Sequence, residues 1–415
     1  MTNAFSWIFL GALAAATATR LWLAARQARH VRAHRDAVPA SFAGTIPLAA
    51  HQKAADYTVA KVRLGVADLL VGVALLLVLT FGGLLEWLSR AWAALAAPGG
   101  IAHGVALVVT LVVLLSAAEL PLSAYRTFVI EARFGFNRMT VALFVADLAR
   151  HAALAAALGV PLLVLVLWLM ERMGELWWVW VWLAWAAFNL AILLVYPTLI
   201  APLFNKFSPL RDLALAARIE ALLARCGFRA SGLFVMDGSK RSSHGNAYFT
   251  GFGAAKRIVF FDTLLARLAP AEIEAVLAHE LGHFKRHHIW KRVALMFAAS
   301  FALLWVLGQL IAEPWFYSGL NVATRSGATA LLLFVLVIPV FMFFLQPLTS
   351  LFSRRHEFEA DAYAASHSSA AELVKALVKL YQDNAATLTP DPIHSAFYDS
   401  HPPAATRIAR LEAKA

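Results

Sequence analysis

The stretch "EIEAVLAHELGHFKRHHIW", residues 272–290, contains His279, Glu280 and His283 in the pattern H-E-x-x-H. Residues i and i+4 of an α-helix share one face about 6 Å apart along the axis, so both histidines can bind one zinc ion. Glu280 then lies beside the metal, where it can take a proton from water and pass it to a leaving amine. The alternative is that these histidines, with His287, only line a solvated helix face.

The neighbouring residues predict where this helix begins and how it continues. Pro270 suits its first position, and Glu272 and Glu274 lie in its first turn, where acidic residues are favoured. The helical pattern continues into the apolar segment that follows, so we expect one helix to run on into that segment. The motif would then lie close to a membrane surface.

The composition indicates a protein that crosses a membrane several times. Of the 415 residues, 61% are hydrophobic and only 15% are charged, and the mean hydropathy is +0.68. An ordinary soluble domain is less apolar than this. Stretches of about 20 apolar residues can cross a bilayer core of about 30 Å. Seven stretches qualify: residues 4–24, 65–88, 102–124, 152–171, 177–200, 293–313 and 328–349.

Basic residues in the short loops predict the orientation of these spans. Segments 20–63 and 123–150 hold eight and four Lys or Arg residues, whereas 89–101, 172–176 and 314–327 hold one each. Basic loops stay on the cytoplasmic side. No basic residue precedes the first apolar stretch, which we interpret as an uncleaved helix rather than a signal peptide. The N-terminus is therefore expected outside and the C-terminus inside, in the cell membrane (the inner membrane of a bacterium).

The net charge and the cysteine content restrict the possible binding partners and the possible types of metal ligand. A net charge of +11 could favour nucleic acid, but the basic residues lie mainly in the inside loops, where the anionic lipid of the bilayer is the simpler partner. We therefore expect no nucleic-acid binding. Cys226 is the only cysteine, which excludes an internal disulfide and any multi-thiolate metal site. A metal ion would need His and carboxylate ligands.

The spans divide the chain into four parts. Residues 1–203 hold five spans, 204–292 form a cytoplasmic domain that contains H-E-x-x-H, 293–349 hold spans six and seven, and 350–415 form a cytoplasmic C-terminal segment. In the second part, two β-rich runs flank the Gly251–Gly253 turn, which predicts a hairpin that ends in a helix. The fold class is therefore an all-α polytopic membrane protein with a small α+β catalytic domain.

A catalytic zinc site needs a third protein ligand and an open fourth position. His287 lies about 12 Å from His279 along the helix axis and cannot reach the same ion. A better candidate is "RRHEFEADAYAASH", residues 354–367, in which Glu357 and Asp361 are one helical turn apart. One carboxylate can bind the metal while the other orients a ligand histidine. An acidic exposed helix face would explain the same residues equally well.

Four motifs together resemble the integral-membrane zinc endopeptidases of the CaaX prenyl protease type. They are "SSHGNAYFTGFGAAKRIVFFDTLL", "LAHELGHFKRHH", "RRHEFEADAYA" and "SHPPAATRIARL", in the order of that family. Two earlier segments, "FVIEARFGFNRMT" at 128–140 and "LIAPLFNKFSPL" at 199–210, are also similar to it. The resemblance thus extends over nearly the whole chain.

The resemblance implies gluzincin chemistry with one zinc ion per chain, held by His279, His283 and Glu357, with Glu280 as general base. It implies that Asp361 lies behind the ligands, and that seven helices enclose a chamber with the zinc site near its cytoplasmic end. Glu359 occupies a position that varies in the family and receives no role.

The resemblance also assigns Asn246 to a strand beside the substrate, and His401 and Arg407 to a tail near the zinc. An Asn beside an edge strand can bind an extended peptide, and a His or Arg can stabilise a tetrahedral oxyanion. Their structural alternatives are a turn residue, a helix cap and a surface cation. We expect all three to act on the substrate rather than on the metal.

The expected function is hydrolysis of peptides or of protein C-termini, including prenylated ones, inside a membrane chamber. A transporter whose His and Glu residues line an ion path is the rival from another class, but both motifs fall outside the apolar spans. A quality-control protease for membrane proteins differs only in its substrates. Glu119, within the third span, is expected either to face a cavity or to lie at the interface.

Overall fold

In the computed structural model, residues 3–250 and 256–413 are described. These residues form seven helices long and apolar enough to cross a membrane, as the sequence predicted. The seven are α1 (Ala4–Ala33), α2 (Leu48–Leu79), α4 (Ile101–Tyr125), α5 (Val141–Arg172), α6 (Trp177–Val195), α11 (His288–Leu310) and α13 (Gly327–Met342). Three of them continue directly into further helical turns. α4 continues into the π-helix η2 (Arg126–Glu131), α6 into the π-helix η4 (Tyr196–Ile200) and α7 (Ala201–Phe204), and α13 into the 3-10 helix η7 (Phe343–Leu345) and α14 (Gln346–His367).

The second span differs from its predicted bounds. It was expected over residues 65–88, but α2 ends at Leu79 and the short helix α3 (Leu84–Ala93) follows as a separate element. Gly83, the residue directly before α3, adopts φ 75°, a left-handed conformation that glycine tolerates without strain. The apolar residues after it therefore belong to α3 and not to the span.

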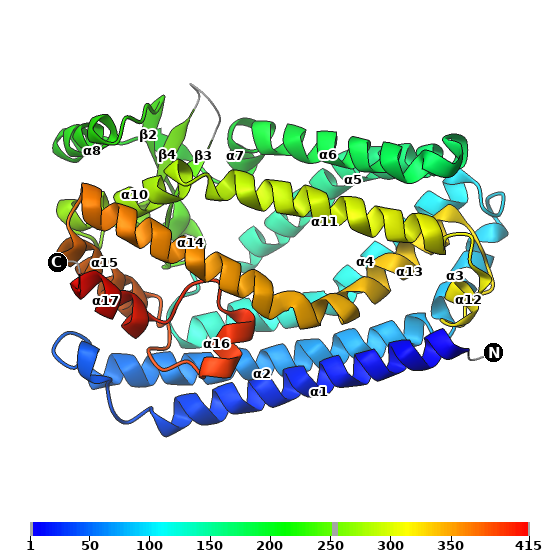
Figure 1. Ribbon diagram of the computed structural model, residues 1–415, viewed down its shortest axis with the longest axis horizontal. Helices are drawn as coiled ribbons and strands as arrows, with labels where there is room; N and C mark the ends of the chain where they lie inside the picture. Colours follow the sequence, from blue (N-terminus) through cyan, green and yellow to red (C-terminus); the bar gives the residue numbers. More distant parts are fainter. Residues whose placement is uncertain (1–2, 251–255, 414–415) are drawn as a thin grey trace.

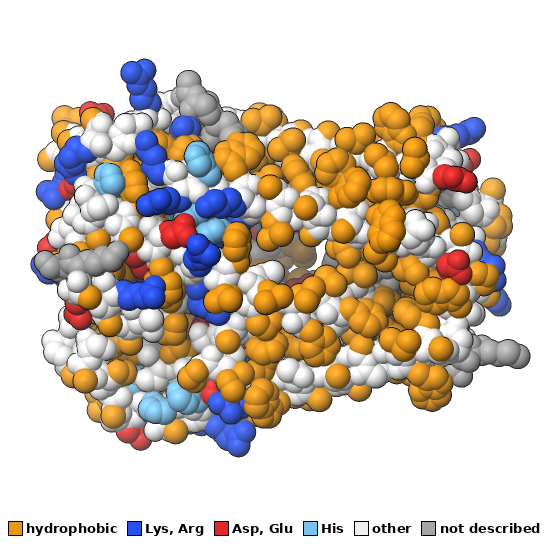
Figure 2. All heavy atoms as spheres, viewed as in Figure 1, with side chains coloured by type: hydrophobic (Ala, Val, Ile, Leu, Met, Phe, Trp, Pro, Cys, Tyr) orange, Lys and Arg blue, Asp and Glu red, His pale blue; other side chains and the backbone are white. Residues whose placement is uncertain are grey.

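The seven helices form a closed ring. In the order α1, α2, α4, α5, α6, α11 and α13, each helix contacts the next, and α13 contacts α1. Only 11% of the most apolar window of α2, and the same share of α5, is buried. Such low burial is expected of helices that face lipid on one side and a chamber on the other, and Figure 2 shows a hollow in the middle of this face. The ring and the hollow agree with the predicted chamber.

Polar side chains line a cavity between neighbouring helices of the ring. A cavity of about 940 Å³ lies between α4, α5 and the segment η4–α7, and Glu119, Asp147 and His151 are among its lining residues. Arg241, from the loop before β3, forms an ion pair with Asp147 at 2.7 Å and reaches the same cavity. Glu119 thus faces a cavity, which is the first of the two alternatives for this carboxylate.

A four-stranded sheet stands at one end of the ring (Figure 1). Its strands are β1 (Phe207–Pro209), β2 (Gly232–Met236), β3 (Ala247–Thr250) and β4 (Arg257–Phe261), in the order β1-β2-β4-β3. β2 and β4 are parallel, and β3 pairs antiparallel with β4. The predicted hairpin therefore exists and leads into α9 (Asp262–Leu265), although Gly251–Gly253 lies outside the described residues. β3 is an edge strand of the described sheet.

Helices pack on this sheet and on one another to form the second core of the molecule. They are α8 (Leu213–Arg225), α10 (Pro270–Lys285), α15 (Ala370–Asp383) and α17 (Ala404–Glu412), together with the C-terminal part of α14. The short helices α12 (Pro314–Ser318) and α16 (Pro392–Tyr398) are the remaining α-helices of the described residues. Ile219, Leu222 and Phe260 are among the apolar side chains that form the core. Residues 204–292 and the C-terminal segment thus share one packed interior.

The helix that carries H-E-x-x-H does not run on into the sixth span, so this prediction is wrong. α10 ends at Lys285, and a separate helix, α11, begins at His288. Between them His287 adopts φ 56° and ψ 31°, a left-handed conformation that interrupts a right-handed helix. α10 packs in the core beneath the sheet while α11 belongs to the ring, and this residue provides the change of direction between them.

Candidate metal centre and active site

A close approach of α10 and α14 brings the two predicted motifs together. Gly282, inside H-E-x-x-H, lies against Ala360, so near that a Cβ atom on Gly282 would stand 2.9 Å from the Ala360 Cα atom. Two small residues at this crossing let the helix backbones approach, as close packing requires. His279 and His283 therefore face Glu357 across the contact between the helices.

The three predicted ligands converge on one point. The Nε2 atoms of His279 and His283 are 3.2 Å apart, and Glu357 Oε1 lies 3.3 Å from His283 Nε2. The other carboxylate oxygen, Oε2, lies 3.5 Å from His279 Nε2. One donor atom from each residue fits within 4.8 Å of the others. Two imidazoles and one carboxylate are a ligand set of catalytic zinc sites.

The same atoms favour a cation at this point. Glu357 Oε2 is buried and has no hydrogen-bond partner among the described residues, which is costly for a carboxylate. Burial lowers the pKa of His279, but hydrogen bonds to Asp361 and Glu357 raise it to about 9. The cluster thus attracts positive charge, and its residues fit a bound metal ion.

Asp361 lies behind His279 and not among the converging atoms. Its Oδ1 atom is 2.9 Å from His279 Nδ1, and Arg407 donates to both carboxylate oxygens, at 2.5 Å and 2.9 Å. A proton on Nδ1 that bonds to Asp361 leaves the Nε2 lone pair of His279 free for a metal. Glu357, and not Asp361, thus lies at the converging Nε2 atoms.

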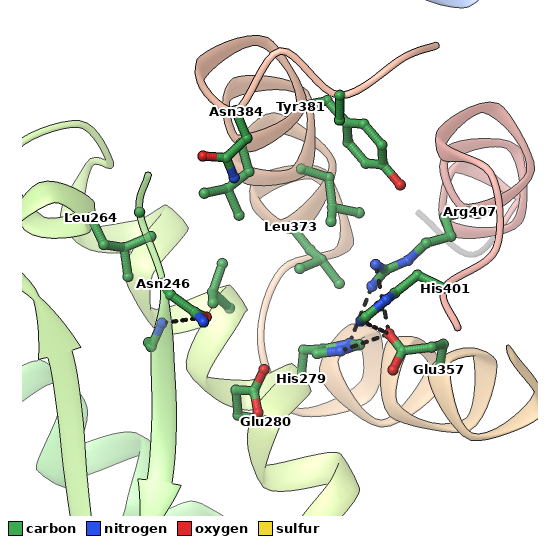
Figure 3. A pocket seen from close by; sticks show the side chains of 16 residues that line it. Asn246, Leu264, His279, Glu280, Glu357, Leu373, Tyr381, Asn384, His401 and Arg407 are labelled. Atoms are coloured by element: carbon green, nitrogen blue, oxygen red, sulfur yellow. Dashed lines mark hydrogen bonds and ion pairs between the residues drawn. The ribbon is translucent and has the colours of Figure 1, made fainter. Parts of the chain in front are cut away.

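A cavity of about 330 Å³ lies in front of this cluster. Figure 3 shows Glu280 on the side of the strand that carries Asn246, while His401 and Arg407 approach Glu357 from the other side. All five side chains line the cavity. A second cavity of about 580 Å³ adjoins the first, since both are lined by Tyr381, Ala386 and His401.

Asn246 and His401 present polar side chains to the cavity. The Asn246 side chain accepts a hydrogen bond from the Ala247 N–H through Oδ1, and its amide NH₂ has no partner in the described part of the chain. The His401 side chain is 61% exposed, although its Nε2 atom lies 3.5 Å from Glu357 Oε2. Both side chains thus offer donors to the cavity.

Sequence reasoning missed several residues of the site. Tyr381 and Asn384, both from the end of α15, line the cavity, and no motif pointed to them. His288 contacts His283, and Glu359, which received no role, contacts His288. The available signal was the pair of adjacent histidines after the motif. His287, which spacing had excluded as a ligand, is exposed.

Comparisons with known proteins agree with this geometry. Residues 27–206 match the family described as CAAX prenyl protease N-terminal, five membrane helices, and residues 209–415 match peptidase family M48. The CAAX prenyl protease 1 of Saccharomyces cerevisiae is 38% identical over 71% of this chain and 68% of its own length. The Homo sapiens CAAX prenyl protease 1 homolog is 31% identical over 71% of this chain and 70% of its own.

A solved structure shares the whole architecture. The crystal structure of S. mikatae Ste24p superposes with a TM-score of 0.91 at 32% identity, and the match covers 99% of both chains. The family models, the related sequences and the solved structure therefore all point to the same family, over both the ring of helices and the C-terminal segment. The chain belongs to peptidase family M48, of the CAAX prenyl protease type, and is an integral-membrane zinc metalloendopeptidase.

Proposed function

We propose that the chain binds one zinc ion through His279, His283 and Glu357 and cleaves extended peptides that reach this centre from the chamber. The convergence of the three ligand residues on one buried point carries the proposal. Zinc bound there supplies Lewis-acid chemistry, which polarises the scissile carbonyl and makes a water molecule more acidic.

Glu280 acts as general base in this proposal. It precedes Leu281 on α10 and lines the cavity beside His279, within the space that a substrate would occupy. Its carboxylate takes the proton of the attacking water and delivers it to the amine that leaves. No other carboxylate besides Glu357 lines this cavity within the described residues, and Glu357 is turned toward the histidines.

The peptide substrate lies between β3 and the C-terminal segment. An edge strand can pair with an extended peptide through main-chain hydrogen bonds, and the free amide of Asn246 adds a donor at its end. On the opposite side, His401 and Arg407 donate to the oxyanion that forms at the scissile carbonyl. The ion pair with Asp361 holds Arg407 in place for this task.

Alanine substitution of Asn246 or His401 is expected to lower turnover by about 10- to 1,000-fold, the range for loss of one transition-state donor. Zinc content should not change, because neither side chain belongs to the converging ligand atoms. Turnover is measured with a fluorogenic peptide, and zinc by elemental analysis. A variant without zinc would show that its residue serves the metal.

The proposed substrates are extended peptides in general, and the prenylated C-termini of CAAX proteins are one class among them. Recognition by an edge strand reads the peptide backbone more than the side chains, which favours broad specificity. A prenyl chain would hold the scissile bond of a C-terminal peptide near the membrane surface. The adjoining 580 Å³ cavity offers room for substrate residues beyond the cleaved bond.

The test of this specificity compares three substrates in detergent-solubilised full-length protein. They are a farnesylated CaaX peptide, the same peptide without the lipid, and an unrelated extended peptide, each with and without a zinc chelator. We expect cleavage of all three, with release of the three terminal residues from the farnesylated one, and loss of all cleavage with the chelator. Cleavage of the farnesylated peptide alone would reject broad specificity, and chelator-resistant cleavage would reject the zinc mechanism. Mass spectrometry that identifies the cleaved proteins would distinguish CaaX-type processing from quality control of membrane proteins.

We also propose that the N-terminus lies outside and that the metal centre lies on the cytoplasmic side of the cell membrane. The start of α1 and the C-terminal helix α17 lie at opposite ends of the long axis (Figure 1), and Lys and Arg side chains gather over the end that carries the sheet (Figure 2). Basic surfaces remain cytoplasmic. Residues 204–292 and 350–415 would then form one catalytic unit on that side.

The orientation predicts the labelling of a cysteine placed at exposed Glu412. An impermeant thiol reagent should modify Glu412→Cys in inverted vesicles and not in intact cells. The natural Cys226 is buried and provides the background control in the unaltered protein. Modification of Glu412→Cys in intact cells would reverse the proposed topology.

A further inference from the structure

We propose that His288 and Glu359 form a hydrogen-bonded chain that positions His283 for metal binding, as Asp361 does for His279. The inference rests on the proposed role of His283 as a ligand, and it assigns tasks to two residues outside the converging ligand atoms. Both are positioning residues, because they act on the metal only through His283.

The chain consists of two consecutive contacts. His283 presents Nε2 to His279 and Glu357, and its other ring nitrogen, Nδ1, lies 3.0 Å from the Nδ1 atom of His288. The remaining nitrogen of His288, Nε2, lies 3.1 Å from Oε2 of Glu359. A carboxylate thus stands behind each of the two ligand histidines, directly in one case and through a second imidazole in the other.

The direction of the hydrogen bonds follows from the ligand role. A metal takes the Nε2 lone pair of His283, so the ring proton of neutral His283 is on Nδ1. His288 Nδ1 must then accept this hydrogen bond, which places the proton of His288 on Nε2. That proton is donated to Glu359, whose ionised carboxylate can only accept. Glu359 therefore selects the one tautomer of His288 that is compatible with metal binding by His283.

Packing fixes the position of His288. Its side chain is 1% exposed, and its ring stacks on His356 with centroids 3.9 Å apart and planes 8° apart. The edge of Phe352 packs against His356 with centroids 4.3 Å apart. The left-handed residue His287 ends α10 and allows His288 to begin α11 next to His283. The helix break that sequence reasoning did not predict is thus the feature that builds this contact.

Without the Glu359 carboxylate, the ring proton of His288 would no longer be held on Nε2. A ring with its proton on Nδ1 would place two N–H donors, from His288 and His283, against each other at 3.0 Å. His283 would then have to rotate or lose the proton arrangement that directs Nε2 to the metal. Removal of such an outer partner typically weakens metal affinity by about 10- to 100-fold.

The test uses Glu359, because this side chain is 32% exposed and its replacement leaves the buried core intact. Glu359→Ala removes the acceptor, whereas Glu359→Gln retains a carbonyl oxygen that can accept from His288. His287→Asn is the matched control, since it alters the exposed neighbouring histidine and Asn tolerates the left-handed conformation. The zinc dissociation constant is measured by competition with a chelator, and the ligand geometry by the visible spectrum of the cobalt-substituted protein.

We expect Glu359→Ala to bind zinc about 10- to 100-fold more weakly and to change the cobalt spectrum. Glu359→Gln should approach the unaltered protein in both measurements, and His287→Asn should equal it. Unchanged affinity and spectrum in Glu359→Ala, or an equal loss in Glu359→Gln, would overturn the proposal. Neither outcome affects the proposed zinc ligands, whose own test is the loss of zinc when Glu357 or either histidine is replaced.

Discussion

Glu280→Gln is expected to abolish peptide cleavage while about one zinc ion per chain remains bound. The amide has the shape of the carboxylate but cannot accept a proton from water at neutral pH, so the step that creates the nucleophile is lost. The ligand atoms of His279, His283 and Glu357 are untouched. General acid–base catalysis contributes about 10²- to 10⁴-fold to a rate, and loss of the base should cost at least this factor.

Glu220→Gln provides the matched control for this variant. Glu220 lies exposed on α8, outside the cavity, so the same chemical change there should leave cleavage and zinc unaltered. Turnover is measured on a fluorogenic peptide, and zinc by elemental analysis of the same samples. Cleavage by Glu280→Gln within about tenfold of the unaltered protein would refute its role as base.

Glu357→Ala is expected to lose the zinc ion and, with it, all cleavage. The two histidines that remain bind the metal weakly, since a stable catalytic site needs three protein ligands. Glu357→Gln is a second variant of nearly the same volume, which tests the charge without a cavity in the contact between α10 and α14. We expect it to bind zinc far more weakly than the unaltered protein.

Zinc content after dialysis decides the identity of the third ligand. His287, which spacing excludes as a third ligand, is the control, and His287→Asn should retain zinc. If His287→Asn lost the metal and Glu357→Ala kept it, the proposed ligand set would be wrong. Thermal unfolding of each variant, with and without added zinc, distinguishes loss of the ligand from loss of the fold.

The amino-acid sequence by itself determined the local features of this protein. Hydrophobic segments of spanning length predicted seven membrane helices, because the bilayer requires about 20 apolar residues for each. The H-E-x-x-H spacing placed His279 and His283 on one helix face, since this depends only on helix periodicity. The two β-rich runs that flank Gly251–Gly253 predicted a hairpin. Each of these inferences depends on neighbours in the chain, and the elements are present in the structure.

The tertiary structure decided what local pattern leaves open. Spacing could not distinguish Glu357 from Asp361, since both lie on one face of α14. The close crossing at Gly282 and Ala360 places Glu357 at the Nε2 atoms of both histidines and Asp361 behind His279. Residue spacing also predicted neither the left-handed conformation of His287 nor the contact of His288 with Glu359. These features arise where segments about 70 residues apart pack together. Helix propensity and periodicity describe one segment at a time, whereas a metal centre is made by the surfaces on which two segments meet.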